Sequence, residues 1–195
     1  MVAERMLPCV IVINKMDRER ANFEKTFDEI KEQLPLKPVV VHLPIGAEED
    51  FKGFVDIIGQ KAYLFDGDKG GHKEADIPED LVDDVAVYRE SLMENVAETD
   101  DDLIEKFLEE GELTAEECIA GLKKGVADGE ITPVCVCSAT LNLGTEAVLD
   151  LVNNVLPSPL ERPVISGTTP DGEDVVERKP EPEEPFCGLV FKTMA

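Results

Sequence analysis

Chemistry is most readily expected at Asn14, Lys15 and Asp17, which follow directly after an apolar run at residues 9–13. A run of this kind, rich in β-branched residues, predicts a strand buried on both faces. Open α/β sheets bind ligands beyond the carboxyl ends of their strands, which is where these three side chains stand. The sequence therefore predicts a binding site in the turn after this strand.

The three side chains suit a guanine base. The carboxylate of Asp17 can accept two parallel hydrogen bonds from N1–H and the exocyclic amine of guanine, an edge that adenine lacks. The stem of Lys15 can lie over a base while its ammonium reaches ribose or phosphate oxygens. Asn14 can brace the loop because its amide both donates and accepts. The alternative is an ordinary turn, since Asn and Asp both favour turns.

A second candidate turn, Ser138-Ala139, follows the apolar run at residues 133–137. Small residues allow backbone N–H groups to approach a base carbonyl such as guanine O6, and the serine hydroxyl can support the loop. The dipeptide alone is almost worthless as a sequence signal. It supports a binding site only because it is paired with the first motif. Together the two motifs indicate nucleotide-recognition loops, which we expect to meet although 121 positions separate Asp17 from Ser138.

The acidic composition narrows the range of partners. The 195 residues carry a formal net charge of −24. Nucleic-acid footprints need clustered Lys and Arg, so no direct nucleic-acid contact is expected. A basic protein surface is the more natural partner, although many acidic surfaces serve only solubility. No run of about 18 apolar residues and no signal-peptide pattern occurs, which predicts no membrane segment.

Cysteine and histidine usage predicts neither disulfides nor a metal site. The cysteines are odd in number, lie in or beside apolar runs and show no Cys-x-x-Cys spacing, which is typical of reduced thiols in a cytoplasmic protein. The two histidines each lack a nearby ligand set, so no metal site is expected. The cysteines are Cys9, Cys118, Cys135, Cys137 and Cys187.

Secondary structure follows from the spacing of the apolar residues. Helices are predicted at residues 22–34, 78–98, 103–108, 115–129 and 145–156. Strands are predicted at residues 39–43, 54–58, 61–65, 133–137, 164–167 and 186–193. Gly59-Gln60 predicts a two-residue type II′ hairpin turn. Thr99 is the predicted cap of the third helix, and Thr114 with Glu117 predicts a capping box on the fourth.

The helix at residues 78–98 carries an acidic face. Glu90, Glu94 and Glu98 recur every four residues, opposite its apolar side. On a bare helix such carboxylates repel one another by a few tenths of a kcal/mol per pair. A cationic partner would relieve that repulsion, and a solvated acidic face is the alternative.

The stretch between the two turns is too long for a simple crossover. Neighbouring parallel strands need about 25 to 30 connecting residues, so roughly 90 are surplus. This surplus has its own predicted strands and helices, which indicates an α+β subdomain inserted at a surface loop. After the proline-rich linker around residues 157–163, the remaining chain reads as part of a β-domain.

Five stretches of the sequence carry a family likeness. They are NKMDRERANF (14–23), LPIGAEEDFKGFVDII (43–58), DIPEDL (76–81), ITPVCVCSA (131–139) and LPSPLERPVISGTTPDG (156–172). In amino-acid sequence and order along the chain they closely resemble the bacterial elongation factor G family, the translocase GTPases of the ribosome. The resemblance spans essentially the whole chain.

The resemblance implies a fold class and four segments. The fold would be α/β, a partial doubly wound P-loop GTPase domain with an inserted α+β subdomain and the beginning of a β-barrel domain. Residues 1–37 resemble the first part of the second half of the G domain, and residues 38–129 resemble the inserted G′ subdomain. Residues 130–159 resemble the last strand and helix of the G domain, and residues 160–195 the linker and the start of domain II.

The resemblance also implies a function. Asn14, Lys15 and Asp17 match the fourth guanine-nucleotide motif, and Ser138 and Ala139 match the fifth. The ligand of the parent protein would be GTP or GDP, and its role translation elongation in the cytoplasm, with GTP hydrolysis coupled to translocation. The partners would be the ribosome and, through the acidic inserted subdomain, the ribosomal stalk protein.

The sequence departs from the family pattern at two levels. Cys137 stands where glycine is usual before Ser-Ala, and residues 140–143 lack the common lysine. The 195 residues contain neither Gly-x-x-x-x-Gly-Lys-Ser/Thr nor a magnesium-binding Asp-x-x-Gly with an adjacent histidine. Because phosphoryl transfer depends on a phosphate cradle and magnesium, the chain is expected to hold no catalytic residue or Mg²⁺ ligand and to be inactive alone. We expect further sequence to precede it in the intact protein.

Two other functions are compatible with the sequence. One is a noncatalytic acidic interaction module with vestigial loops, and the other is a related ribosome-associated GTPase of the ribosome-protection or release-factor type. The inserted segment and the LPSPLERP linker favour the translocase over the second. A phosphate loop upstream of this chain would argue against the first.

Overall fold

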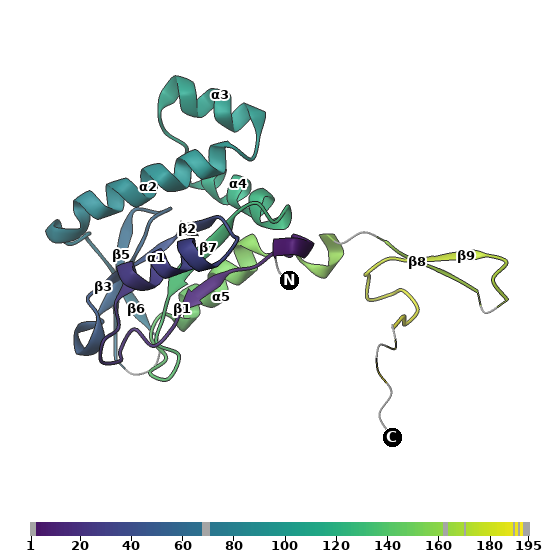
Figure 1. Cartoon of the computed structure of the whole chain (residues 1–195), viewed down its shortest axis with the longest axis horizontal. Coiled ribbons are helices and arrows are strands. Elements are labelled where there is room, and N and C mark those ends of the chain that lie inside the picture. Colours follow the sequence, from purple (N-terminus) through teal and green to yellow (C-terminus); the bar gives the residue numbers. More distant parts are fainter. Residues whose placement is uncertain are drawn as a thin grey trace. The chain divides into compact units, whose positions relative to one another are not determined.

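The computed structural model describes residues 3–67, 71–161, 164–169, 171–188, 190 and 192. Its chain divides into two compact units, Met1–Leu156 and Pro157–Ala195 (Figure 1). The first unit holds a parallel sheet, an antiparallel sheet and most of the helices. The predicted α/β class is therefore confirmed.

The parallel sheet has three strands in the order β1 (Ile11–Ile13), β7 (Thr132–Val136) and β2 (Pro38–Val40). The central strand, β7, is buried at every residue, as its apolar run predicts. The prediction that the first strand is buried on both faces is wrong, because Val12 of β1 is 38% exposed. Among the described residues β1 is an edge strand, so only part of its surface is covered.

Two helices with apolar faces belong to this part of the unit (Figure 1). Helix α1 (Phe23–Gln33) begins at the predicted cap, where the Asn22 side chain accepts a hydrogen bond from the Lys25 N–H at 2.8 Å. Helix α5 (Thr145–Val155) begins after Gly144, whose φ of 75° suits a glycine. Both helices lie within two residues of their predicted bounds, since their apolar residues recur at helical spacing.

The antiparallel sheet runs in sequence order through β3 (His42–Ile45), β4 (Gly53–Asp56), β5 (Lys61–Phe65) and β6 (His72–Ala75). The single strand predicted at residues 39–43 is in fact two strands in two sheets. Val41 joins them.

Val41 serves both sheets through its backbone. Its N–H donates to the Val134 carbonyl at 2.9 Å, and its carbonyl accepts the N–H of Ile57 at 3.0 Å. The side chain of Val41 is 1% exposed, so the junction lies in the core. An apolar run is consistent with one strand or with two, and only these long-range hydrogen bonds divide it.

The predicted two-residue hairpin turn is wrong. Asp56 and Lys61 are the last paired residues, which leaves a four-residue loop between β4 and β5. The left-handed residue of this loop is Gln60, with φ 53°, rather than Gly59. The Asp56 carboxylate accepts the Ile58 N–H at 2.9 Å and so builds the turn from its first side.

Three helices follow the antiparallel sheet: α2 (Val82–Ala97), α3 (Asp101–Glu110) and α4 (Ala115–Ala127). The cap predicted at Thr99 is wrong. Asp100 caps α3 by accepting the Asp102 N–H at 3.1 Å, while the Thr99 hydroxyl donates to the Val96 carbonyl at 2.7 Å. The capping box predicted on α4 is confirmed in full. Short 3₁₀ helices occur at Ala3–Arg5, Glu48–Asp50, Glu79–Leu81 and Pro159–Glu161.

The second unit contains one antiparallel hairpin, β8 (Ile165–Thr168) with β9 (Val175–Arg178). The strand predicted at residues 164–167 is confirmed within one residue. Its partner is β9, which the sequence did not predict because charged residues flank a short apolar pair. The strand predicted at residues 186–193 is absent from the described residues 186–188, 190 and 192, and its other positions lie outside the described residues.

Candidate functional site

The two predicted recognition turns emerge side by side from neighbouring strands. Ile13 of β1 is paired with Val136 of β7 in parallel register, so both strands end at the same edge of the sheet. The contact continues past the strands, because the Cys137 N–H donates to the Ile13 carbonyl at 3.0 Å and the Met16 N–H donates to the Cys137 carbonyl at 3.3 Å. Met16 is 1% exposed and anchors the first turn in the core.

Asp17 and Ser138 are in direct contact. The Ser138 hydroxyl lies 2.5 Å from Oδ1 of Asp17, where it donates to the carboxylate. Ser138 is fully buried, and the Asp17 side chain is 11% exposed. The second carboxylate oxygen lies 3.4 Å from Nε of Arg18. The hydrogen bond from the Ser138 hydroxyl is charge-assisted, and it fixes the orientation of the Asp17 carboxylate.

Asn14 links the same two turns through its side-chain carbonyl. Oδ1 of Asn14 accepts the backbone N–H of Lys15 at 2.7 Å and that of Ala139 at 3.0 Å. The Cys137 thiol lies 3.5 Å from the same oxygen. With this oxygen occupied, the amide nitrogen of Asn14 is the group left to face outward.

Lys15 and Ala139 are exposed at the surface of the turns. Lys15 has a φ of 66°, a left-handed conformation that is costly for a residue with a side chain. No ion pair holds its ammonium within the part of the chain that the structure describes. Its side chain is therefore free to cover a ligand.

Cys137 is a contributor to this arrangement that sequence reasoning recognised only as a departure. Its side chain is 3% exposed, and burial raises the pKa of the thiol. The thiol is therefore protonated at neutral pH and able to donate weakly towards Asn14. No sequence signal marks this contact, because it depends on the pairing of β1 with β7.

The loop after Ser138 closes on itself before α5. Ser138 and Leu143 exchange two backbone hydrogen bonds, at 2.9 and 3.0 Å. A Cβ placed on Gly144 would lie 3.1 Å from the Val136 carbonyl oxygen, so this glycine allows α5 to start close to β7. The position of Ser138 is thus set from both sides of the loop.

The acidic residues Glu90, Glu94 and Glu98 lie exposed on α2, as the helical spacing predicts. Glu98 has a cationic partner within the chain, because its Oε2 lies 2.5 Å from Nζ of Lys37. The predicted mutual repulsion is therefore offset at one of the three positions. Val87, at 64% exposure, lies one turn before Glu90 on the same helix.

The described ranges contain neither a metal-binding cluster nor a membrane-spanning helix. Within them, no three acidic, cysteine or histidine side chains are grouped so as to hold a metal ion. None of the helices in the described segments is both long and apolar enough to cross a bilayer.

Residues 1–158 match the family model described as the elongation factor Tu GTP binding domain. The crystal structure of a protein from Thermus thermophilus is similar, with a TM-score of 0.72 and 30% sequence identity over 83% of this chain. This chain spans only 24% of the length of that protein.

Proposed function

The chain belongs to the elongation factor Tu GTP-binding domain family of translational GTPases, and from that premise we propose that it is the base-recognition half of a ribosomal translocase of the elongation factor G type. Guanine-nucleotide binding is a property of this family. The finer proposal rests on the five resembling stretches and on the geometry of the two turns.

In this proposal the guanine base lies between the two turns. Asp17 accepts N1–H and the exocyclic amine, Lys15 covers the face of the base, and Asn14 holds the turns together. The N–H of Ala139 is bonded to Asn14, so a contact from it to guanine O6 would be shared. The observation that carries the proposal is the 2.5 Å contact between Ser138 and Asp17, which orients the carboxylate.

GTP hydrolysis would depend on other parts of the intact protein. The 195 residues contain no phosphate loop, and base contacts alone supply neither a phosphate cradle nor Mg²⁺ ligands. We therefore assign the catalytic groups and the metal ligands to segments outside this chain.

We assign residues 38–129 to an inserted subdomain that docks on the ribosomal stalk protein in the cytoplasm. Its first three residues, Pro38–Val40, form β2 and pair with β7 in the parallel sheet. The exposed carboxylates of Glu90 and Glu94, together with Glu98, offer a negatively charged surface to a basic partner. Residues 1–37 and 130–159 would complete the G-domain half, and residues 160–195 would begin a β-barrel domain.

The test of base recognition is Asp17→Asn in the longer protein that we propose contains this chain. An amide at this position presents one acceptor and one donor, so it should lose guanine and favour xanthine, whose base carries a carbonyl in place of the amine. We expect the ratio of GDP to xanthosine diphosphate affinity to fall by about 10² or more. Competitive binding of fluorescent nucleotides measures this ratio.

Asp28→Asn is the matched control, because it removes one carboxylate from the exposed surface of α1. It should leave the preference for guanine intact. An Asp17→Asn variant that still prefers GDP to the same degree would rule out the assigned role of Asp17.

A further inference from the structure

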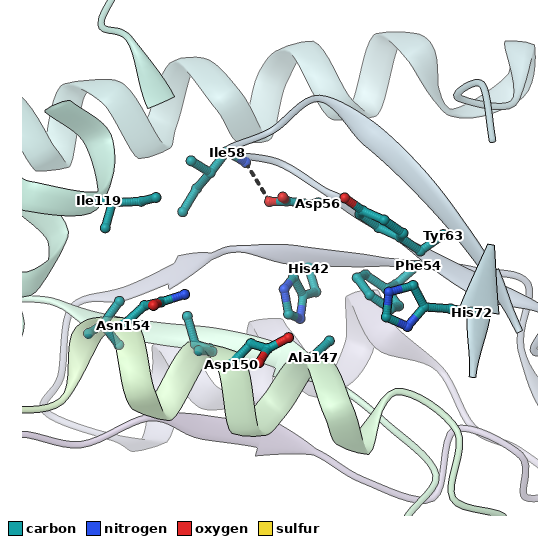
Figure 2. A pocket seen from close by; sticks show the side chains of 12 residues that line it. His42, Phe54, Asp56, Ile58, Tyr63, His72, Ile119, Ala147, Asp150 and Asn154 are labelled. Carbon is teal, nitrogen blue, oxygen red and sulfur yellow. Dashed lines mark hydrogen bonds between the residues drawn. The ribbon is translucent and has the colours of Figure 1, made fainter. Parts of the chain in front are cut away.

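A pocket of about 240 Å³ lies between the antiparallel sheet and α5 (Figure 2). None of its lining residues belongs to the two recognition turns. All five strand residues in its wall come from the antiparallel sheet, while α5 supplies one helical face. Its lining includes His42, Phe54, Asp56, Tyr63, His72 and Asp150.

His42 is the buried polar group of this pocket. It is 7% exposed, and its Nδ1 is buried with no hydrogen-bond partner among the described residues. Burial lowers the pKa of His42 to about 4, so the imidazole is neutral at physiological pH. Buried polar atoms in proteins normally have a partner, so the unpartnered imidazole is an exceptional polar group in the wall of this pocket.

Aromatic rings form one wall. The ring centroids of His42 and Phe54 are 4.7 Å apart, and those of Phe54 and Tyr63 are 5.3 Å apart. His72 meets Tyr63 edge-on at 4.9 Å. A wall of neighbouring aromatic faces attracts cations and packs well against a flat apolar body.

The charges around the pocket are negative. Asp56 from β4 and Asp150 from α5 point into the space between the sheet and the helix (Figure 2). No Lys or Arg lines it in the described part of the chain. Arg89, which contacts the lining residue Ile58, is committed to the carbonyl oxygens of Ile57 and Ile58, each at 3.0 Å.

We propose that this pocket binds a small organic cation, a protonated amine on a flat apolar body. The ammonium would lie between the carboxylates of Asp56 and Asp150, beside the ring of His42, and the body would pack on Phe54 and Tyr63. The volume falls below the range typical of drug-sized ligands, which limits the ligand to a single ring or a short chain.

The test is a titration of the ¹⁵N-labelled 195-residue chain with benzylamine, followed by amide chemical shifts. We expect saturable shifts centred on the lining residues. Benzyl alcohol has the same body without the charge and should bind about tenfold more weakly, and benzoate should not bind.

Asp150→Asn removes one carboxylate from an exposed position on α5, and Asp83→Asn removes one from an exposed position on α2, away from the pocket. We expect the first variant to weaken benzylamine roughly fivefold and the second to leave it unchanged. The spectra themselves report whether each variant keeps its fold.

Three results would overturn the proposal. Shifts that do not saturate would mean that the pocket holds water only. Equal affinity for benzyl alcohol and benzylamine would mean that charge is not recognised. Equal weakening by the two substitutions would mean that only the net charge of the protein matters.

Discussion

A single hydroxyl shows how closely the two turns depend on each other. Ser138 is fully buried, and its Oγ lies 2.5 Å from the carboxylate of Asp17. A buried hydroxyl without a partner costs about 1–3 kcal/mol, so each residue needs the other for stability as well as for geometry. Ser-Ala is a common dipeptide, but this contact is the reason to pair Ser138 with the turn that contains Asp17.

His42 predicts a pH dependence of stability. Its pKa is about 4 in the folded chain and near 6.5 when unfolded, so the unfolded state takes up a proton first as the pH falls. Stability that is present above pH 6.5 should be lost progressively down to pH 4, by at most about 3 kcal/mol. Burial raises the pKa of Asp56, which acts in the opposite direction.

Urea unfolding of wild type and His42→Gln between pH 7 and pH 4 measures this effect. The variant should show a smaller loss over that range, whatever its stability at pH 7. Asn153→Gln is the control, because Asn153 is exposed on α5 and has no titrating group, so the slope should stay unchanged. Parallel curves for wild type and His42→Gln would show that His42 does not cause the acid sensitivity.

At the scale of elements, the position of α4 depends on a glycine. A Cβ on Gly121 would lie 2.6 Å from Cγ1 of Val96 and 2.8 Å from Cδ1 of Leu103. Alanine favours a helix over glycine by about 1 kcal/mol, but Val96 is stiff and fully buried. The close approach of α4 to α2 and α3 should therefore decide the outcome.

We expect Gly121→Ala to lower the free energy of unfolding by about 1–3 kcal/mol, the usual cost of overpacking. Chemical denaturation followed by circular dichroism measures this. Gly167→Ala is the control, since its Cβ meets nothing within 4 Å and the position has no positive φ. An unchanged or raised stability in Gly121→Ala would show that the three helices can separate at little cost.

The acidic face of α2 predicts a graded response to charge reversal. Glu98 is paired with Lys37, whereas Glu90 and Glu94 have no such ion pair in the described part of the chain. Replacing Glu90 and Glu94 by lysine should weaken binding to the carboxyl-terminal domain of the stalk protein by about tenfold at low salt. Glu98→Lys alone should have a smaller effect, because its carboxylate is already engaged.

Calorimetric titration at two salt concentrations measures this binding. Reversal of Glu105 and Glu109 on α3 is the matched control, because these are also exposed glutamates four residues apart. If reversal on α3 weakens binding as much as reversal on α2, the interaction depends on net charge and not on this face. Wild-type affinity after reversal on α2 would leave that face as solvated surface.

The whole molecule combines a well-packed unit with a small one. The first unit has a continuous buried core, and in the second the hairpin residues Ile165 and Val175 are 58% and 72% exposed. A two-stranded hairpin is marginally stable by itself. The first unit therefore carries the stability on which the two recognition turns depend.

At this scale we predict that the 195-residue chain binds GDP weakly or not at all. The side chains proposed to contact the base are present, but the phosphate groups that supply much of the affinity for a nucleotide have no cradle in its sequence. Isothermal titration with GDP measures this, with the longer protein of the proposed function as the control. Micromolar binding by this chain alone would show that the base site needs no phosphate anchor.

Much of the fold could be predicted from the sequence. The helices α1, α2, α4 and α5 and the strand β7 were found because their apolar residues follow helical or strand spacing, and α1 and α4 also have the predicted side-chain caps. Errors occurred where a local pattern allowed more than one structure. The turn after β4 is built by the Asp56 side chain and not by a left-handed glycine. The cap of α3 is Asp100 and not Thr99. The apolar run around Val41 contributes to two sheets and not to one strand.

For the site, the sequence by itself determined which side chains are available. Asn14, Lys15 and Asp17 follow one strand and Ser138 and Ala139 follow another, and their types indicate a base with paired donors. Whether those turns meet was decided only by the tertiary structure, through the parallel pairing of β1 with β7. The pocket around His42 was also decided there, because hydrogen bonds and burial between residues far apart in sequence leave no local pattern.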